Sequence, residues 1–249
     1  GEAQAIGADF SEARLDDANL YKADFSNADL SGASLGACTA LHARFTEANL
    51  DRSDCRQGLF VEADLSRTSL QGATWYKAQF VKAKLNGSQA RKADLKECVF
   101  AEAEANGCDF SSADLRGVIA VKSSFKGLLG VGVQATGSGW AQSELGGADF
   151  SRAQLAQAGF MDAKLHNVDF TRANLRRAML LNASLRSSCL DGAQMYEASL
   201  RGADLTNSSL RHANLHSVDM GNTTLECCDM TGARLLQTHL EMPSANPQT

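Results

Sequence analysis

Proline is almost absent from this chain, and so is any long hydrophobic run. The 249 residues include two prolines, Pro243 and Pro247, both at the C-terminal end. Proline cannot donate to a β-ladder, so β-structure can continue without interruption as far as Pro243. No run of 18 apolar residues occurs, which argues against a membrane-spanning helix, and no signal-like segment opens the chain. We therefore expect a bacterial cytoplasmic protein.

The sequence also lacks the motifs that carry catalysis. It contains no phosphate-binding loop, no dinucleotide fingerprint and no zinc-ligand spacing. None of its five histidines is placed with a Ser or Cys nucleophile and a supporting acid. The sequence therefore predicts a protein that is not an enzyme, with no catalytic residues, no cofactor and no metal.

What the chain has instead is a five-residue repeat, clearest between Ala148 and Leu185. From Phe10 to Leu240 every fifth residue is large and apolar or, occasionally, small, and all 11 Phe and both Trp fall on this position. Two residues earlier the chain is mostly Ala, with other small residues filling nearly all the remaining places. No insertion or deletion breaks the register. A fixed period of this kind decides the architecture before any local structure is considered.

Three segments carry the resemblance to a known family: Ala8-Asp9-Phe10, Ala18-Asn19-Leu20 and Ala113-Asp114-Leu115. They resemble the Ala-(Asp/Asn)-Leu-x-x consensus of the pentapeptide-repeat family. The resemblance implies an all-β fold, a right-handed quadrilateral β-helix in which four repeats make one coil of 20 residues. The large and the small residue of each repeat then point inward. About twelve coils would stack into a rod on the order of 55–60 Å long, at the strand spacing of about 4.8 Å.

The pattern predicts a single domain over residues 3–240 and a C-terminal tail over residues 241–249. Within it, residues 116–147 are rich in glycine and could form a flexible loop between two arrays. We instead expect continuous coils with local distortion, because large residues in the small position are followed by small residues in the large position. Such exchanges conserve interior volume. The compensating pairs are Val118 with Ala120, Leu128 with Gly130, and Val133 with Ala135.

The repeat begins almost at the first residue. The chain starts with Gly1 rather than Met, and Ala3 and Ala5 already keep the register. We expect a domain taken from a longer protein. An open end of a β-helix also exposes unpaired backbone, which favours association.

Cysteines occupy interior positions of the repeat. Cys38, Cys98, Cys108 and Cys228 take the small inward position and Cys55 the large one, so we expect free thiols acting as small apolar residues. Free thiols suit a reducing compartment. The adjacent Cys227 and Cys228 are expected on opposite sides of one strand and therefore do not form a metal-binding pair.

Sorting the sequence by a period of 20 separates four walls and four corners. One corner column is dominated by Gly and Asn, which tolerate positive φ, so type II turns are expected there. It reads Gly7, Asn27, Glu47, Arg67, Gly87, Gly107, Gly127, Gly147, Asn167, Ser187, Asn207 and Cys227.

One wall differs from the polar others because its outward positions are apolar. A strand that is apolar on both sides is normally covered on both sides. From Tyr21 to Leu181 the column spans eight coil steps, about 38 Å at strand spacing, and an apolar surface of that size exceeds what a monomer usually leaves open. The predicted interaction face consists of Tyr21, Leu41, Leu59, Val61, Val81, Val99, Ile119, Val121, Met161, Met179 and Leu181.

A charged column runs beside this face and predicts cross-strand ion pairs and a polar rim. It reads Lys22, His42, Glu62, Lys82, Glu102 and Lys122.

These features favour a protein–protein interaction or scaffold domain. The partner could be another part of the parent chain, a second copy, or another protein. Arrays resembling this one occur in larger bacterial proteins, including secretion-system accessory and effector proteins.

The alternative is a DNA mimic acting on DNA gyrase, a role that some family members have. The chain departs from that pattern because its acidity is confined to residues 1–65 and no helix follows Leu240. The basic residues of the middle region spread over several walls, which argues against nucleic-acid binding.

Overall fold

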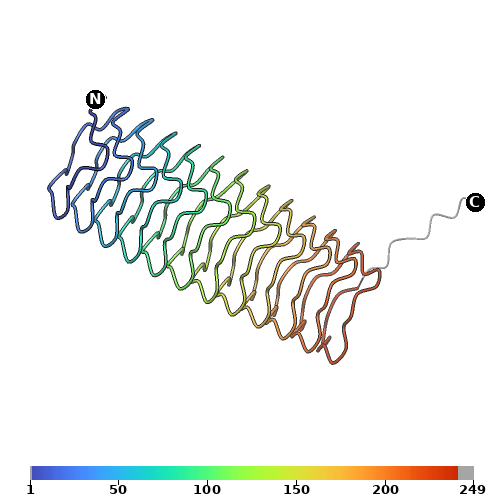
Figure 1. Cartoon of the computed structure of the whole chain (residues 1–249). Coiled ribbons are helices and arrows are strands. Elements are labelled where there is room, and N and C mark those ends of the chain that lie inside the picture. The colour runs from blue at the N-terminus through green and yellow to red at the C-terminus, as the bar shows by residue number, and fades with distance from the viewer. Residues whose placement is uncertain (1, 241–249) are drawn as a thin grey trace, which may run out of the picture.

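Stacked square coils form a straight rod, described in a computed structural model over residues 2–240 (Figure 1). Every outward residue between two inward ones forms a parallel β-bridge with the residue 20 positions later, from Gln4–Asp24 to Asp219–His239. The result is the predicted right-handed quadrilateral β-helix. Its first and last coils lie at opposite ends of the rod. The predicted tail, residues 241–249, lies outside the described residues.

The β-structure consists of one bridging residue per wall and coil, with a turn at each corner. We name each wall after one of its bridging residues. In chain order these are the Asp24, Asp29, Asp54 and Leu59 walls, and the order repeats every 20 residues. The Asp54 and Leu59 walls therefore share a corner.

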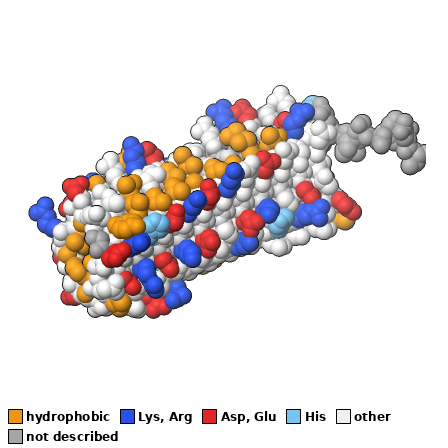
Figure 2. Space-filling model, turned by 90° about the horizontal axis from the view of Figure 1, so that it is seen from above, with side chains coloured by type: hydrophobic (Ala, Val, Ile, Leu, Met, Phe, Trp, Pro, Cys, Tyr) orange, Lys and Arg blue, Asp and Glu red, His pale blue; other side chains and the backbone are white. Residues whose placement is uncertain are grey.

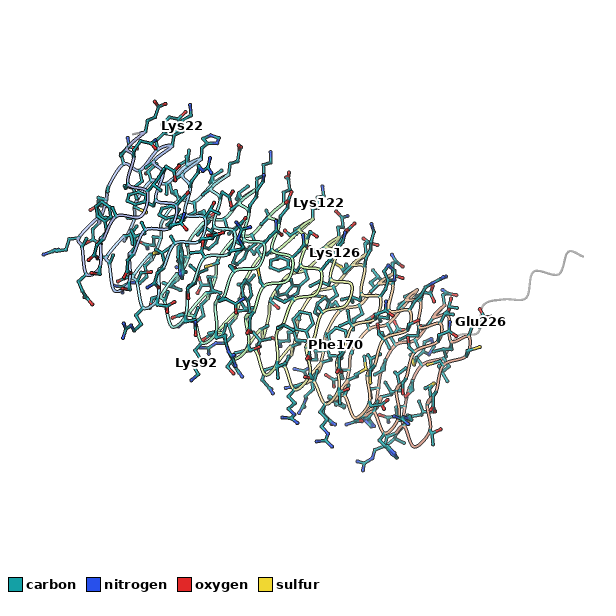
Figure 3. All side chains as sticks on the ribbon, in the orientation of Figure 1. Lys22, Lys92, Lys122, Lys126, Phe170 and Glu226 are labelled. Atoms are coloured by element: carbon teal, nitrogen blue, oxygen red, sulfur yellow. The ribbon has the colours of Figure 1, made fainter. Side chains whose placement is uncertain are left out.

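The interior is filled by the large and small residues of each repeat. Phe170 points into the coil stack, whereas Lys22, Lys92 and Lys122 point away from it (Figure 3). Aromatic rings contact one another along the axis; for example, Phe80 and Phe100 stack with their ring centroids 4.7 Å apart. Burial of these side chains, at about 1.5–3 kcal/mol each, is the main source of stability.

All four corners turn in the same way, although positive φ was expected at only one. The second turn residue has positive φ at every corner, including Glu12 (58°), Asp17 (57°) and Lys22 (52°) as well as Gly7 (64°). The turn closes with a hydrogen bond between residues three apart, such as the amide of Ala8 donating to Ala5 O at 3.1 Å. A turn with positive φ at its second central residue, and not at its first, is a type II turn. The prediction was too narrow because side chains other than Gly and Asn occupy this conformation throughout.

The coils continue through residues 116–147 without a break. Ile119 bridges Val99 and Gly139, and the same turn-and-bridge pattern runs through the whole segment. Residues 116–147 therefore do not form a loop between two arrays. A Cβ on Gly130 would lie 3.1 Å from the ring of Phe150, so glycine makes room for that ring.

Small inward residues that carry an O–H or S–H group donate a hydrogen bond to a backbone carbonyl, a contact that the sequence did not predict. Thr68 Oγ1 donates to Phe45 O at 2.8 Å, and Cys98 Sγ donates to Trp75 O at 2.9 Å. These acceptors belong to the previous coil. The described cysteines are all free, as expected. Cys98 and Cys108 are thus hydrogen-bond donors and not only apolar fillers, and burial raises the pKa of Cys108 to about 11.

Candidate functional site

The predicted interaction face is brought together on the Leu59 wall and its adjoining corner. Leu59, Gln79, Val99 and Ile119 follow one another as bridge partners. The next column is aligned by turn hydrogen bonds, such as the amide of Glu62 donating to Val81 O at 2.9 Å. We call the predicted set the apolar strip. It comprises Tyr21, Leu41, Leu59, Val61, Val81, Val99, Ile119, Val121, Met161, Met179 and Leu181.

The strip is exposed unevenly. Ile119, Met179 and Leu59 expose 48%, 46% and 39% of their surface, whereas Val61 and Val81 are half-buried. Residues of one column stand a single strand spacing apart, so each side chain covers the flanks of its neighbours. Hydrophobic side chains gather into a band along the rod, with charged side chains beside it (Figure 2).

A notch interrupts the strip in its C-terminal half, where the two outward residues are Gly139 and Ala141. A Cβ on Gly139 would meet only Val118 O, at 3.9 Å, so the space in front of this residue is open. One coil further on, Gly159 is buried, and a Cβ there would meet Met179 Cε at 3.8 Å. The strip therefore has bulky residues in its first half and a depression beyond its centre.

The charged column beside the strip pairs its own charges from coil to coil. His42 Nδ1 lies 3.3 Å from Glu62 Oε2, and Lys82 Nζ lies 3.8 Å from Glu102 Oε2. Hydrogen bonding to Tyr21 and the charge of Glu2 raise the pKa of Lys22. Lys22 with Glu2 and Lys82 with Glu102 are thus exposed ion pairs of the rim, which contribute little to stability.

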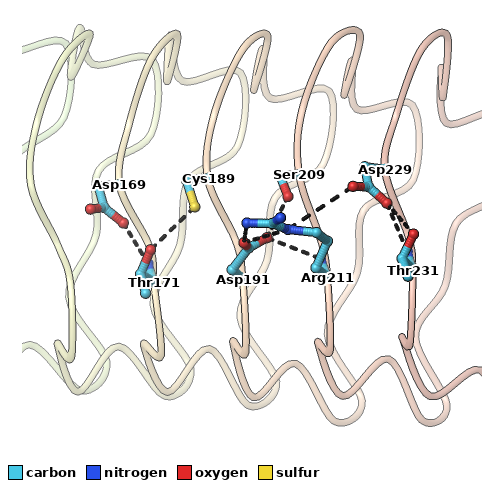
Figure 4. Close-up of polar contacts among 8 residues, drawn as sticks. All are labelled: Asp169, Thr171, Cys189, Asp191, Ser209, Arg211, Asp229 and Thr231. Carbon is cyan, nitrogen blue, oxygen red and sulfur yellow. Dashed lines mark hydrogen bonds and ion pairs between the residues drawn. The ribbon is translucent and has the colours of Figure 1, made fainter.

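The Asp29 wall shows what a wall without such a strip looks like (Figure 4). Asp191 Oδ2 accepts hydrogen bonds from Arg211 at 2.9 and 2.7 Å, and Asp229 Oδ1 accepts the amide of Thr231 at 2.9 Å. These polar groups are satisfied within the rod. An apolar pair on the same side, Leu129 and Val131, is isolated in a single coil.

A groove on the Asp54 wall escaped the sequence analysis. It is an open hollow of about 460 Å³ whose floor contains Gln154, Asn174, Gln194 and Asn214. The signal was present in the sequence, because sorting by 20 places these amides in one column. We call this hollow the amide groove. It is lined by Gln154, Arg172, Asn174, Arg176, Gln194, Tyr196 and Asn214.

Within residues 2–240, no three His, Cys, Asp or Glu side chains converge in an arrangement that could hold a metal ion. The same part of the chain contains no helix with the length and hydrophobicity needed to cross a membrane.

Comparison with known sequences points to one family. The sequence profile described as Pentapeptide repeats matches overlapping segments from residues 2–36 to 93–127, and again from 141–172 to 193–232. No curated protein matches the chain.

Several solved structures are similar. HetL from the cyanobacterium Nostoc sp. strain PCC 7120, a pentapeptide repeat protein involved in heterocyst differentiation regulation, is 27% identical. That match covers 95% of this chain and 88% of HetL, with a TM-score of 0.31. QnrB1, a plasmid-mediated fluoroquinolone resistance protein, is 18% identical, and the match covers 84% of this chain and 90% of QnrB1 with a TM-score of 0.42. A thylakoid-lumen pentapeptide repeat protein from Arabidopsis thaliana is 28% identical over 53% of this chain and 68% of that protein, with a TM-score of 0.18.

Proposed function

Because the chain belongs to the pentapeptide-repeat family, we propose that it is a non-enzymatic protein-interaction rod whose apolar strip docks onto the strip of a second copy. The observation that carries this proposal is the gathering of apolar side chains on one wall and its adjoining corner, with Leu59, Ile119 and Met179 exposed. A wall that is apolar outside as well as inside is normally covered. Such a scaffold suits a larger bacterial cytoplasmic protein, for example a secretion-system accessory protein or effector.

The distribution of large and small residues favours a second copy in the antiparallel direction. Two rods lying side by side and antiparallel would set the bulky first half of one strip, with Leu59 and Val61, against the Gly139 notch of the other. Parallel rods would place notch over notch and leave a void. Two-fold pairing also satisfies the requirement that the same surface be used by both copies.

The charged rim permits this approach. Glu102 is already paired with Lys82, so the apolar strips can meet without leaving this carboxylate unpaired. The strip is short compared with obligate interfaces, and specific interfaces below about 1,200 Å² in total are typically weak. We therefore expect a reversible, concentration-dependent dimer.

The test is the molar mass in solution, measured by sedimentation equilibrium over a range of concentrations. The wild-type protein should dimerise, and the double substitution Val81→Asp with Val121→Asp should weaken dimerisation roughly 100-fold or more, since central contacts cost about 2 kcal/mol or more each. The matched control is Leu129→Asp with Val131→Asp on the Asp29 wall, which should leave dimerisation unchanged. A wild-type protein that stays monomeric, or equal effects of both double substitutions, would contradict the proposal.

The alternative function is DNA mimicry directed at DNA gyrase. It would require carboxylates free to imitate phosphates, but many are engaged with the rod itself; Asp24 Oδ1, for example, accepts the amide of Ser26 at 2.9 Å. A supercoiling assay separates the two functions. Inhibition or protection of gyrase at micromolar protein that survives the Val81→Asp and Val121→Asp substitutions would favour the mimic over the apolar strip.

A further inference from the structure

The amide groove is a second surface, separate from the apolar strip, and its floor has an unusual composition. Five successive coils of the Asp54 wall carry an amide at the bridging position, each bridged to the next. They are Gln134, Gln154, Asn174, Gln194 and Asn214. Asn174 Nδ2 donates to Gln154 Oε1 at 3.0 Å, and Asn214 Nδ2 donates to Gln194 Oε1 at 3.4 Å. Each amide has two N–H donors and an acceptor oxygen with two lone pairs. The floor therefore keeps donors and acceptors available for a ligand.

Two arginines and a tyrosine flank this floor. Arg172 lies at the corner on one side, and Arg176 and Tyr196 lie at the corner on the other. The guanidinium of Arg176 lies 5.4 Å from the centroid of the Tyr196 ring, whose other neighbour is His216 with ring centroids 5.2 Å apart. Arg176 and His216 therefore cover the two faces of the Tyr196 ring, and the groove offers a ligand hydrogen-bonding amides and positive charge.

Among the described residues, neither Arg172 nor Arg176 has a carboxylate within 4.0 Å, whereas the nearby Glu197 is bonded to Arg177 at 2.6 Å. The first half of the same wall is different. Asp54 and Asp114 stand in the amide column there, and each holds the arginine two residues later, at 2.5 Å for Arg56 and 2.6 Å for Arg116. Replacing carboxylates by amides in the second half therefore frees the corner arginine to bind an external anion.

The chemistry of the groove suits an acidic sugar. Guanidinium groups bind carboxylates through two parallel hydrogen bonds. Side-chain amides form hydrogen bonds with hydroxyl groups. A uronic acid presents a carboxylate and hydroxyl groups on one ring.

The spacing of the floor distinguishes among polymers. The amides repeat once per coil, about 4.8 Å. An extended peptide repeats on one side at about 6.6 Å, twice its rise per residue, and successive nucleotides of a duplex strand rise about 3.4 Å. Neither keeps register with the column, whereas a pyranose ring with its linkage is close to one coil rise. We propose that the amide groove binds a uronate-containing oligosaccharide along the rod axis, with its carboxylates at Arg172 and Arg176.

The experiment is titration calorimetry of the whole chain with a galacturonate hexamer, in low salt. Binding should be measurable, and it should weaken roughly tenfold or more in Arg176→Gln, because a hydrogen bond between charged groups is lost. The matched control is Arg56→Gln, the same corner position in the first half of the wall, which should bind like the wild type. Asn174→Asp should abolish binding, because the new carboxylate would pair with Arg176 in the way that Asp54 pairs with Arg56.

Two further ligands make the result specific. A neutral galactose hexamer should bind at least tenfold more weakly than the galacturonate, and a short DNA duplex should not compete with it. The proposal is overturned if the galacturonate does not bind, if Arg56→Gln and Arg176→Gln weaken it equally, or if the DNA duplex binds as tightly. All variants lie on the outside of the rod, and an unchanged melting temperature checks that they fold. Dimerisation through the apolar strip serves as an independent readout.

Discussion

The Leu59 wall and the Asp54 wall are built from the same coils and turns and share a corner, yet their outward residues differ. The first half of one wall presents leucine, valine and isoleucine, and the second half of the other presents glutamine and asparagine. The bridging residue is Ile119 on one wall and Gln134 on the next. The backbone register is identical for both. The difference teaches that this fold separates stability from function: inward residues hold the rod, and outward columns can change without altering it.

The largest expected effects lie inside the rod and should be similar behind both walls. Phe100 is buried behind the apolar strip and Leu175 behind the amide groove, each with no exposed surface. Phe100→Ala should cost about 3–5 kcal/mol and Leu175→Ala about 2–5 kcal/mol, because each leaves a cavity. Urea unfolding measures both. A cost below about 1 kcal/mol behind only one wall would show that the walls are not equivalent inside.

A smaller effect should distinguish the two buried tryptophans. Trp140, behind the Leu59 wall, donates its indole N–H to Ser138 Oγ at 2.7 Å, whereas Trp75 Nε1, behind the Asp54 wall, is buried without a partner. Ser138→Ala should therefore cost about 1–3 kcal/mol by orphaning the indole, and Ala73→Ser should stabilise the protein by about 1 kcal/mol by supplying the missing acceptor. Thermal and urea unfolding of the two variants provide the measurement. If Ala73→Ser destabilises the protein, the unpartnered indole N–H of Trp75 does not limit its stability.

The shape of the apolar strip can be changed without disturbing its backbone. Gly139→Leu should fill the notch and weaken dimerisation roughly tenfold, since overpacking an interface typically costs 1–3 kcal/mol. Gly146→Leu is the control, because Gly146 lies away from the strip, at the corner between the Asp24 and Asp29 walls. A Cβ there would meet only His166 O, at 3.7 Å. Sedimentation equilibrium compares the two. Unchanged dimerisation in Gly139→Leu would rule out antiparallel pairing against the notch.

The smallest effect concerns an exposed charge on the Asp24 wall, away from the bridging residues of both the apolar strip and the amide groove. Glu144 lies 2.5 Å from Lys126 and 2.8 Å from Lys164, and hydrogen bonds from these lysines lower its pKa to about 2. A lowered pKa stabilises the fold above the unfolded value of about 4.3, and this contribution is lost as the pH falls toward about 2.

Because the Glu144 carboxylate is 35% exposed, solvent screening should hold the effect of Glu144→Gln below about 1 kcal/mol at pH 7. Urea unfolding at pH 7 and pH 2 should show a small difference from the wild type that disappears at pH 2. A difference that persists at pH 2 would mean that the ion pairs are not its source.

The period of 20 predicted which residues share a wall, and that is why Tyr21 and Leu181 could be placed on one strip from sequence. The uniform corners were less apparent, although a signal exists: the positive-φ position holds no β-branched residue between Glu2 and Gln237. The pairing of the corner arginines could not be predicted in the same way. Whether an arginine is held by its own wall, as Arg56 is, or left available, as Arg172 is, depends on distances that periodicity does not specify.

Oxidation of the strip methionines tests most directly whether the apolar strip is covered. On a single rod Met161 and Met179 are 39% and 46% exposed, whereas Met195 is fully buried. Peroxide converts exposed methionine to the sulfoxide, which peptide mass spectrometry follows residue by residue. Under dimerising conditions Met161 and Met179 should oxidise several-fold more slowly in the wild type than in the Val81→Asp, Val121→Asp variant, with Met195 slow in both. Equal rates for Met161 and Met179 in the two proteins would contradict the account.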